Sequence, residues 1–281
     1  MGVGLAQMND NALPRIATAG RAGPPLRLGG LLRDRPRLRA AALSAGALAR
    51  SLERAPPGIY TLCYHHVARD TASNFAAQLA LMARHGTFVG ADAAVERLVS
   101  SRPIDERLFV LTFDDGYLDT VEVAMPAIMR RGIPAMLFLV SDWLDAPPDD
   151  GQCYAGRGEV EAWIAAGLDI GSHTASHRRL SGLPDADVAA ELNRSAAILG
   201  ALWGRPIRHF ACPWGVPDAD YLPARDVALA REAGYETFFT TRRGRTRDPA
   251  SLMAMPRHVL EPEWPTSHLE TLMGGWRFGR R

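Results

Sequence analysis

Two adjacent carboxylates mark the end of one apolar segment of the sequence. Residues 108–113 (LFVLTF) read as a buried strand, and Asp114 and Asp115 follow it directly, before Gly116. Burying two neighbouring carboxylates is costly unless a cation or several hydrogen-bond donors compensate them. We therefore expect positive charge next to this pair in the folded protein.

The segment GSHTASH, residues 171–177, contributes two histidines to the same argument. His173 and His177 are four residues apart, so a helix starting there would point both rings to one face, where they could share a metal ion. A polar loop is the alternative for the two histidines alone. Two imidazoles and one carboxylate are a common ligand set for a hydrolytic metal ion. Because adjacent strand residues point in opposite directions, one aspartate could bind the ion while the other acts as a base.

Three motifs together resemble the polysaccharide deacetylase family, also called the NodB homology domain or carbohydrate esterase family 4. They are TFDDG at residues 112–116, His173-x-x-x-His177, and FACPWG at residues 210–215. YHHV at 64–67 and MPRHV at 255–259 resemble flanking segments of bacterial members, and the resemblance extends over roughly residues 59–273. It implies a distorted (β/α)7 barrel and removal of N-acetyl groups from amino sugars.

The resemblance also implies the roles of individual residues. Asp114 would be the general base that takes a proton from water. The divalent metal ion, Zn²⁺ in the first place but with Co²⁺, Ni²⁺ or Mn²⁺ possible, would be held by Asp115, His173 and His177. The backbone N–H of Trp214 would stabilise the oxyanion. The substrate would be bound by His65, Pro213, Trp214 and Gly215.

Two positions depart from the family pattern. The third motif often carries an arginine that orients the base, but this chain has Phe210 there, so we expect Arg257 to take that role. A histidine that would serve as general acid in a late Leu-x-His motif is not cleanly present. His258 and His65 are the two candidates, although strand alternation argues against Arg257 and His258 both facing the site.

Strand-like and helix-like segments alternate from residue 59 onward, which predicts parallel β/α units. About seven such units in one domain fit a barrel better than an open sheet, and barrels of this kind place their sites where strands end. The expected strands are 59–64, 108–113, 135–140, 168–171, 208–212, 237–241 and 255–260. The expected helices are 74–85, 91–100, 120–131, 159–166, 185–203, 224–233 and 267–273.

Charge is distributed unevenly along the 281 residues. Residues 1–57 carry nine arginines against three acidic residues, a net charge of +6, and the remainder carries −5. We interpret 1–57 as a poorly ordered extension and linker with one short helix over 39–54, and 58–281 as the deacetylase-like domain. The basic segment lacks interleaved aromatic residues and the main domain is acidic, so we do not expect nucleic-acid binding.

These observations favour a metal-dependent de-N-acetylase acting on an N-acetylated poly- or oligosaccharide. The alternatives are a catalytically silent relative that binds glycan, and an amidase or deformylase acting on a small or lipid-linked amide. The chain has no lysine, which excludes Schiff-base chemistry, and no run of about 20 apolar residues. Three separated cysteines without a CxxC pair and no convincing signal peptide lead us to expect a cytoplasmic rather than an exported protein.

Overall fold

The computed structural model of this chain describes residues 56–100, 102–146 and 152–275. All of them belong to one compact unit. The helix expected over residues 39–54 lies outside the described residues, and the domain boundary at residue 57 stays a prediction.

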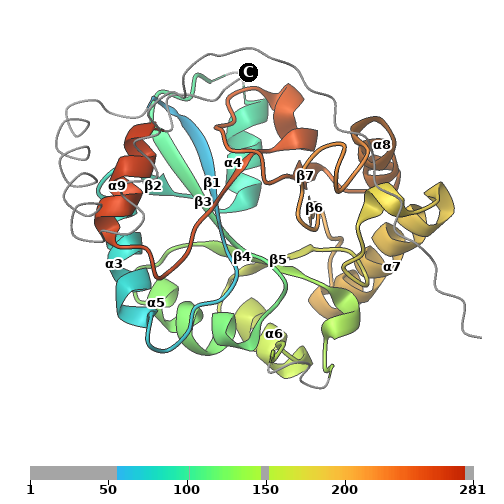
Figure 1. Cartoon of the computed structure of the whole chain (residues 1–281), viewed down its shortest axis with the longest axis horizontal. Coiled ribbons are helices and arrows are strands. Elements are labelled where there is room, and N and C mark those ends of the chain that lie inside the picture. Colours follow the sequence, from blue (N-terminus) through green and yellow to red (C-terminus); the bar gives the residue numbers. More distant parts are fainter. Residues whose placement is uncertain (1–55, 101, 147–151, 276–281) are drawn as a thin grey trace, which may run out of the picture. The chain divides into compact units, whose positions relative to one another are not determined.

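Eight parallel strands form a single sheet (Figure 1). Its order is β7-β6-β5-β4-β3-β1-β8, with the short β2 paired to β3. The two edges meet just past β7, where the Thr240 N–H donates to the Met255 carbonyl at 2.8 Å, so the sheet is a nearly closed barrel. The predicted distorted (β/α)7 barrel is confirmed. The strands are β1 (Gly58–Tyr64), β2 (Thr87–Phe88), β3 (Arg107–Phe113), β4 (Ala135–Leu139), β5 (Asp169–Ser172), β6 (His209–Ala211), β7 (Thr237–Phe239) and β8 (Arg257–Val259).

Helices surround the strands, as Figure 1 shows for α3, α5, α6, α7 and α8. The expected helix over 120–131 is divided into a π-helical turn and a short α-helix, because Pro126 has no N–H to donate to the preceding turn. Within the part of the chain that the structure describes, no helix has the length and apolar character needed to cross a bilayer. The helices are α3 (Ala72–Ala83), α4 (Ala91–Val99), η1 (Thr120–Ala124), α5 (Met125–Met129), η2 (Ser141–Trp143), α6 (Arg157–Ala165), η3 (Leu180–Gly182), α7 (Asp185–Trp203), α8 (Pro223–Glu232), η4 (Pro249–Ala254) and α9 (Thr266–Gly275).

Alternation along the strands divides the core into two parts. On β1 and β3, Tyr60 and Phe109 pack in the larger cluster, which also contains apolar residues of the surrounding helices. Ile59 and Val110 belong to a second cluster inside the barrel. Helix α4 contributes to this inner cluster and bonds through Asp92 to His209 at the start of β6, so it covers the amino-terminal end of the strands. The opposite, carboxyl end is left for the polar residues of the site.

Candidate active site

The end of β3 places both aspartates in the mouth of the barrel. The Asp114 N–H donates to the Tyr64 carbonyl at 3.0 Å, so the pairing of β1 with β3 continues for one residue and Asp114 keeps the inward direction. Asp115 then takes a left-handed conformation with φ 70°, and Gly116 follows with φ 77°. The left-handed φ favours glycine at this position, and a Cβ at Gly116 would lie 2.7 Å from Leu139 Cδ2, so the leucine side chain would have to move. The expectation that the two carboxylates point to opposite sides is wrong, because the chain turns at Asp115 and both carboxylates face His173.

The histidine segment after β5 is a loop and not a helix, so the helical explanation for the spacing of His173 and His177 is wrong. Thr174 and His177 both adopt left-handed conformations, with φ of 68° and 58°. The Thr174 hydroxyl accepts a hydrogen bond from the His177 N–H at 2.9 Å, which stabilises the bend. The bend brings the two imidazole rings to a centroid separation of 5.0 Å.

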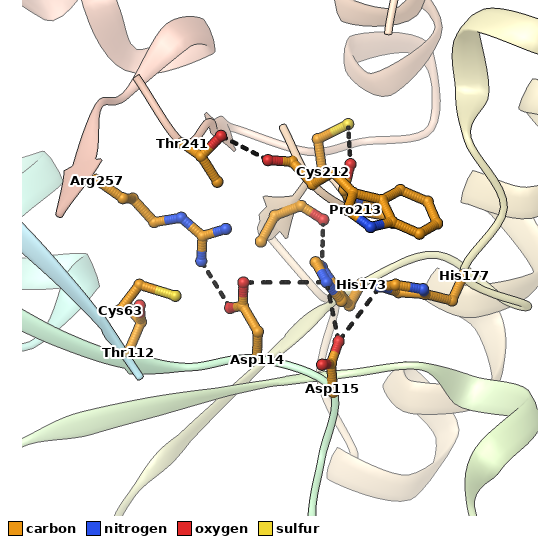
Figure 2. Close-up of polar contacts among 12 residues, drawn as sticks. Cys63, Thr112, Asp114, Asp115, His173, His177, Cys212, Pro213, Thr241 and Arg257 are labelled. Carbon is orange, nitrogen blue, oxygen red and sulfur yellow. Dashed lines mark hydrogen bonds and ion pairs between the residues drawn. The ribbon is translucent and has the colours of Figure 1, made fainter. Parts of the chain in front are cut away.

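Three side-chain donor atoms converge where these two segments meet (Figure 2). Asp115 Oδ1 lies 3.3 Å from His173 Nε2 and 3.3 Å from His177 Nε2. His173 Nδ1 donates to the Ala211 carbonyl at 2.8 Å, so in the neutral ring the Nε2 lone pair faces the aspartate. Asp115 Oδ1 is buried, and no hydrogen-bond donor satisfies it within the described residues.

This donor set fits a divalent metal ion. An unprotonated nitrogen facing a carboxylate oxygen is repulsive unless a cation lies between them. Four ligands arranged tetrahedrally at about 2.0–2.1 Å from zinc lie roughly 3.3–3.4 Å from one another, which agrees with the two observed separations of 3.3 Å. The arrangement also explains how the protein tolerates two aspartates at the end of a core strand.

The two carboxylates are held ionised by their surroundings. Burial would raise the pKa of Asp115, but the imidazoles of His173 and His177, each 3.3 Å from its Oδ1, outweigh burial and place that pKa well below its ordinary value. Burial acts in the same way on Asp114, where the positive charge of Arg257 is the largest opposing influence and the pKa again lies below its ordinary value. The same carboxylates outweigh burial at His173 and raise its pKa.

Arg257 is the partner of Asp114. Its Nη1 donates to Asp114 Oδ1 at 2.6 Å and its Nε donates to the Thr240 carbonyl at 3.2 Å, with the side chain fully buried. The contact forms because β8 pairs with β1, with Arg257 opposite Thr61, and β1 in turn pairs with β3. Phe210, at the position of the family arginine, instead packs with its ring 5.0 Å from that of Phe238 in the core.

The two histidines proposed as general acids lie in different places. His258 packs against Tyr60, with ring centroids 5.9 Å apart, and its Nε2 donates to the Gly244 carbonyl at 2.8 Å. Burial lowers the pKa of His258 to about 4. Its bond to Gly244 therefore holds Nε2 away from the site, as strand alternation requires. A ring nitrogen of His65, in contrast, lies within 4.8 Å of the Asp114 carboxylate.

His65 and Trp214 also line a pocket, but Pro213 and Gly215 do not. The volume of the pocket is ≈ 500 Å³, and it is lined by His65, Arg179, Trp214, Val216, Ala219, Asp220, Thr241 and Val259. Pro213 and Gly215 are buried behind it. Gly215 is required by the turn, because its φ is 71° and a Cβ there would lie 2.9 Å from the Thr241 backbone nitrogen. Trp214 is 43% exposed, and its ring centroid lies 4.6 Å from that of His177.

The structure adds a row of aromatic side chains that sequence reasoning missed. The ring of Tyr117 stacks on His66 at a centroid distance of 3.6 Å and on Tyr154 at 5.3 Å. Tyr154 contacts Trp143 at 4.4 Å, and Trp143 contacts His177 at 5.1 Å. Tyr117 directly follows the TFDDG motif and could have been included on that ground. Trp143 and Tyr154 come from a distant segment, and no motif marked them.

Sequence comparisons agree with this site. The family model described as polysaccharide deacetylase matches residues 101–238. YxkH of Bacillus subtilis (strain 168), a candidate polysaccharide deacetylase, is 22% identical over 214 residues, which cover 74% of this chain and 73% of the relative. The chain belongs to the polysaccharide deacetylase family. The family match contains both aspartates and both histidines, but it ends before Arg257.

Solved structures share the fold of this chain. IcaB from Ammonifex degensii is 24% identical with a TM-score of 0.66, and the similarity covers 78% of this chain and 97% of IcaB. The Streptococcus pyogenes deacetylase PplD, solved in complex with acetate, is 19% identical with the same TM-score, covering 78% of this chain and 99% of PplD. The barrel described above is therefore the fold of these two proteins.

Proposed function

We propose that this member of the family is a metal-dependent de-N-acetylase that removes acetyl groups from N-acetylated amino sugars in a poly- or oligosaccharide. The proposal depends on two groups of side chains that lie next to each other at the end of β3. A ligand set of one carboxylate and two imidazoles lies directly beside a second carboxylate that an arginine holds ionised. Acyl hydrolysis needs both, because water has to be activated while a carbonyl is polarised.

The ligands for the metal would be Asp115, His173 and His177, and their N and O donors suit Zn²⁺ as well as other first-row divalent ions. An ion held there supplies Lewis acidity for the acyl carbonyl and makes water more acidic. The first histidine is already fixed for this role, because its Nδ1 bonds to the Ala211 carbonyl and its Nε2 is left for the ion.

Asp114 would act as the general base. Its Oδ1 is bound by Arg257, whereas its Oδ2 faces the ligand set at 3.9 Å from His173 Nε2. The guanidinium keeps the carboxylate ionised and fixes its plane, so Oδ2 can accept the proton of the attacking water. Removal of that proton lets the water oxygen bond to the acetamide carbonyl carbon.

Two further groups would complete the reaction. Within the described residues, the Trp214 backbone N–H has no hydrogen-bond acceptor, so it is available to donate to the oxygen that becomes negatively charged. When the C–N bond breaks, the sugar nitrogen needs a proton, and His65 could supply it, because it lines the pocket and has a ring nitrogen within 4.8 Å of the Asp114 carboxylate. The products are acetate and the free amino sugar.

Acetate release tests the proposal. We expect the zinc-loaded protein to release acetate from an N-acetylated chitooligosaccharide, to lose this activity on dialysis against a chelator, and to regain it when Zn²⁺ is returned. Formate release from a formamide, with no acetate from the oligosaccharide, would favour the amidase or deformylase alternative. Glycan binding without release of either acid would identify a silent relative and refute the proposal.

A further inference from the structure

Helix α7 contains a buried carboxylate, Glu191, that the proposed chemistry does not use. It is 6% exposed, and within the described residues it forms no ion pair with a basic side chain. Burying such a charge is costly unless hydrogen bonds compensate it. Both of its oxygens are in fact hydrogen-bonded, and every donor comes from the loop between the two histidines.

Three donors surround this carboxylate. Glu191 Oε2 accepts from the Ala175 N–H at 3.0 Å and from the Ser176 N–H at 2.8 Å. Glu191 Oε1 accepts from the Ser176 hydroxyl at 2.5 Å. Hydrogen bonds to an ionised acceptor are roughly twice as strong as neutral ones. The two residues it holds are two of the three that lie between the candidate metal ligands His173 and His177.

The opposite side of the same loop is also fixed. The backbone N–H groups of Ser141 and Asp142 donate to the carbonyls of Thr174 and Ala175, at 3.3 and 2.9 Å. The loop carbonyls are thus held by the segment after β4, whereas the loop N–H groups are held by Glu191. Left-handed conformations at non-glycine residues cost free energy and persist only where the surroundings enforce them. Thr174 and His177 are both in that region.

We propose that Glu191 is a positioning residue for the metal ligands, whose carboxylate fixes the loop at Ala175 and Ser176 and so aims both imidazoles at Asp115. This inference rests on the proposed metal site. It assigns the residue no contact with substrate or with the ion. Its effect passes through the peptide units that join His173 to His177, because rotation of those units would swing the second ring away from the first.

Glu191→Met is the discriminating substitution, because glutamine could keep all three contacts. Its oxygen could accept from the two backbone N–H groups while its NH₂ group donates to the Ser176 hydroxyl, which is also an acceptor. Methionine fills similar space without a carboxylate, so the N–H groups of Ala175 and Ser176 lose their acceptor. Loss of groups that orient metal ligands typically weakens metal binding about 10- to 100-fold, and we expect a loss in that range.

Ser195→Ala is the matched control. Ser195 is also buried and lies one helical turn further along α7, so it is on the same face. Its hydroxyl bonds at 2.8 Å to that of Ser172, the last residue of β5, and not to the loop. Ser176→Ala is the complementary variant, because it removes only the hydroxyl donor and leaves both backbone donors bound to Glu191.

The experiment measures the affinity for Zn²⁺ by competition with a chromophoric chelator, the visible absorption spectrum of the Co²⁺-loaded protein, and the Tm of each metal-free variant. We expect affinity to fall in the order wild type, Ser176→Ala, Glu191→Met, with altered cobalt bands in the last. Ser195→Ala should keep wild-type affinity and spectrum, even where its Tm falls as much.

Two results would overturn the inference while leaving the metal site intact. The first is a Glu191→Met protein that binds Zn²⁺ within about threefold of wild type, well short of the 10-fold minimum expected. The second is a loss of affinity no larger than that of Ser195→Ala. If Glu191→Met does not fold, Ser176→Ala decides by the same comparison. Failure of the proposed function has a different signature, because wild type itself would then bind no Zn²⁺.

Discussion

Replacing Arg257 by methionine tests the most specific contact in the site. The guanidinium is fully buried and donates to Asp114 Oδ1 at 2.6 Å. Methionine fills similar space without charge, so the substitution leaves a buried carboxylate without its cation. Removing one partner of a buried ion pair typically costs about 3–5 kcal/mol of folding free energy. We expect the loss of this ion pair to lower the Tm. We also expect it to change the pH dependence of catalysis.

The direction of the pH effect follows from the pKa of Asp114. Arg257 is the largest influence that lowers this pKa against burial, so the variant should have a higher one. A base works only when ionised, so the acidic limb of the kcat/KM profile should move to higher pH. The contribution of the pair to stability is present above the ordinary carboxyl pKa and is lost as pH falls through the lower folded value. In Arg257→Met, protonation of Asp114 begins at higher pH.

The assay is acetate release across pH 4–9, together with metal content and Tm. Arg208→Met is a suitable control, because Arg208 also forms short ion pairs, with Asp92 at 2.6 Å and Glu236 at 3.3 Å, but next to the start of β6. The control should keep the wild-type acidic limb. An unshifted limb with near-normal kcat in Arg257→Met would show that Asp114 does not depend on this arginine and would refute the reasoning.

Three further predictions follow from the same geometry. Asp114→Asn should keep wild-type metal content and lose about 10²- to 10⁴-fold in kcat; retention of more than about a tenth of wild-type kcat would exclude it as the base. His65→Ala should lower kcat most for substrates with poor leaving groups, whereas His258→Gln should have little effect on kcat because His258 is bound to Gly244; equal losses in kinetic assays would contradict the assignment. A chain that begins at Pro56 should keep the kcat and Tm of the full chain, because β1 begins at Gly58 and the Pro56 and Pro57 carbonyls accept bonds from Tyr60 and Arg245; an insoluble product would contradict this.

Much of the barrel could be predicted from the sequence, because the spacing of apolar residues indicates which face of each helix or strand is buried. Helix α7 was placed at residues 185–203 with both ends correct, since its apolar pattern runs from Pro184 to Gly204 at the C-cap. Boundaries were less certain where strands are short. Strand β6 covers only 209–211 of the expected 208–212, although the Cys212 N–H still donates to the Phe239 carbonyl of β7 and the Arg208 carbonyl accepts from the Thr237 N–H.

Local geometry in the site could not be predicted in the same way. The spacing of His173 and His177 is also that of a helix, and only the left-handed conformations at Thr174 and His177 show that a loop joins them. Glu191 carries no signal at all, because its partners are 15 and 16 residues away and its role depends on how α7 packs. Motifs identify the atoms that do chemistry more readily than the groups that hold them.

The strand pairing that closes the barrel also completes the site. Arg257 reaches Asp114 only because β8 pairs with β1, and the segment before β8 is bonded to residues just past β7. The proposed metal ligands, in contrast, lie on loops after β3 and β5, within residues 115–177. The family match ends at residue 238 and therefore includes the ligands but not the arginine. It follows that a chain ending before β8 would keep every proposed metal ligand, yet it would leave the base without its cation and the barrel without its last strand.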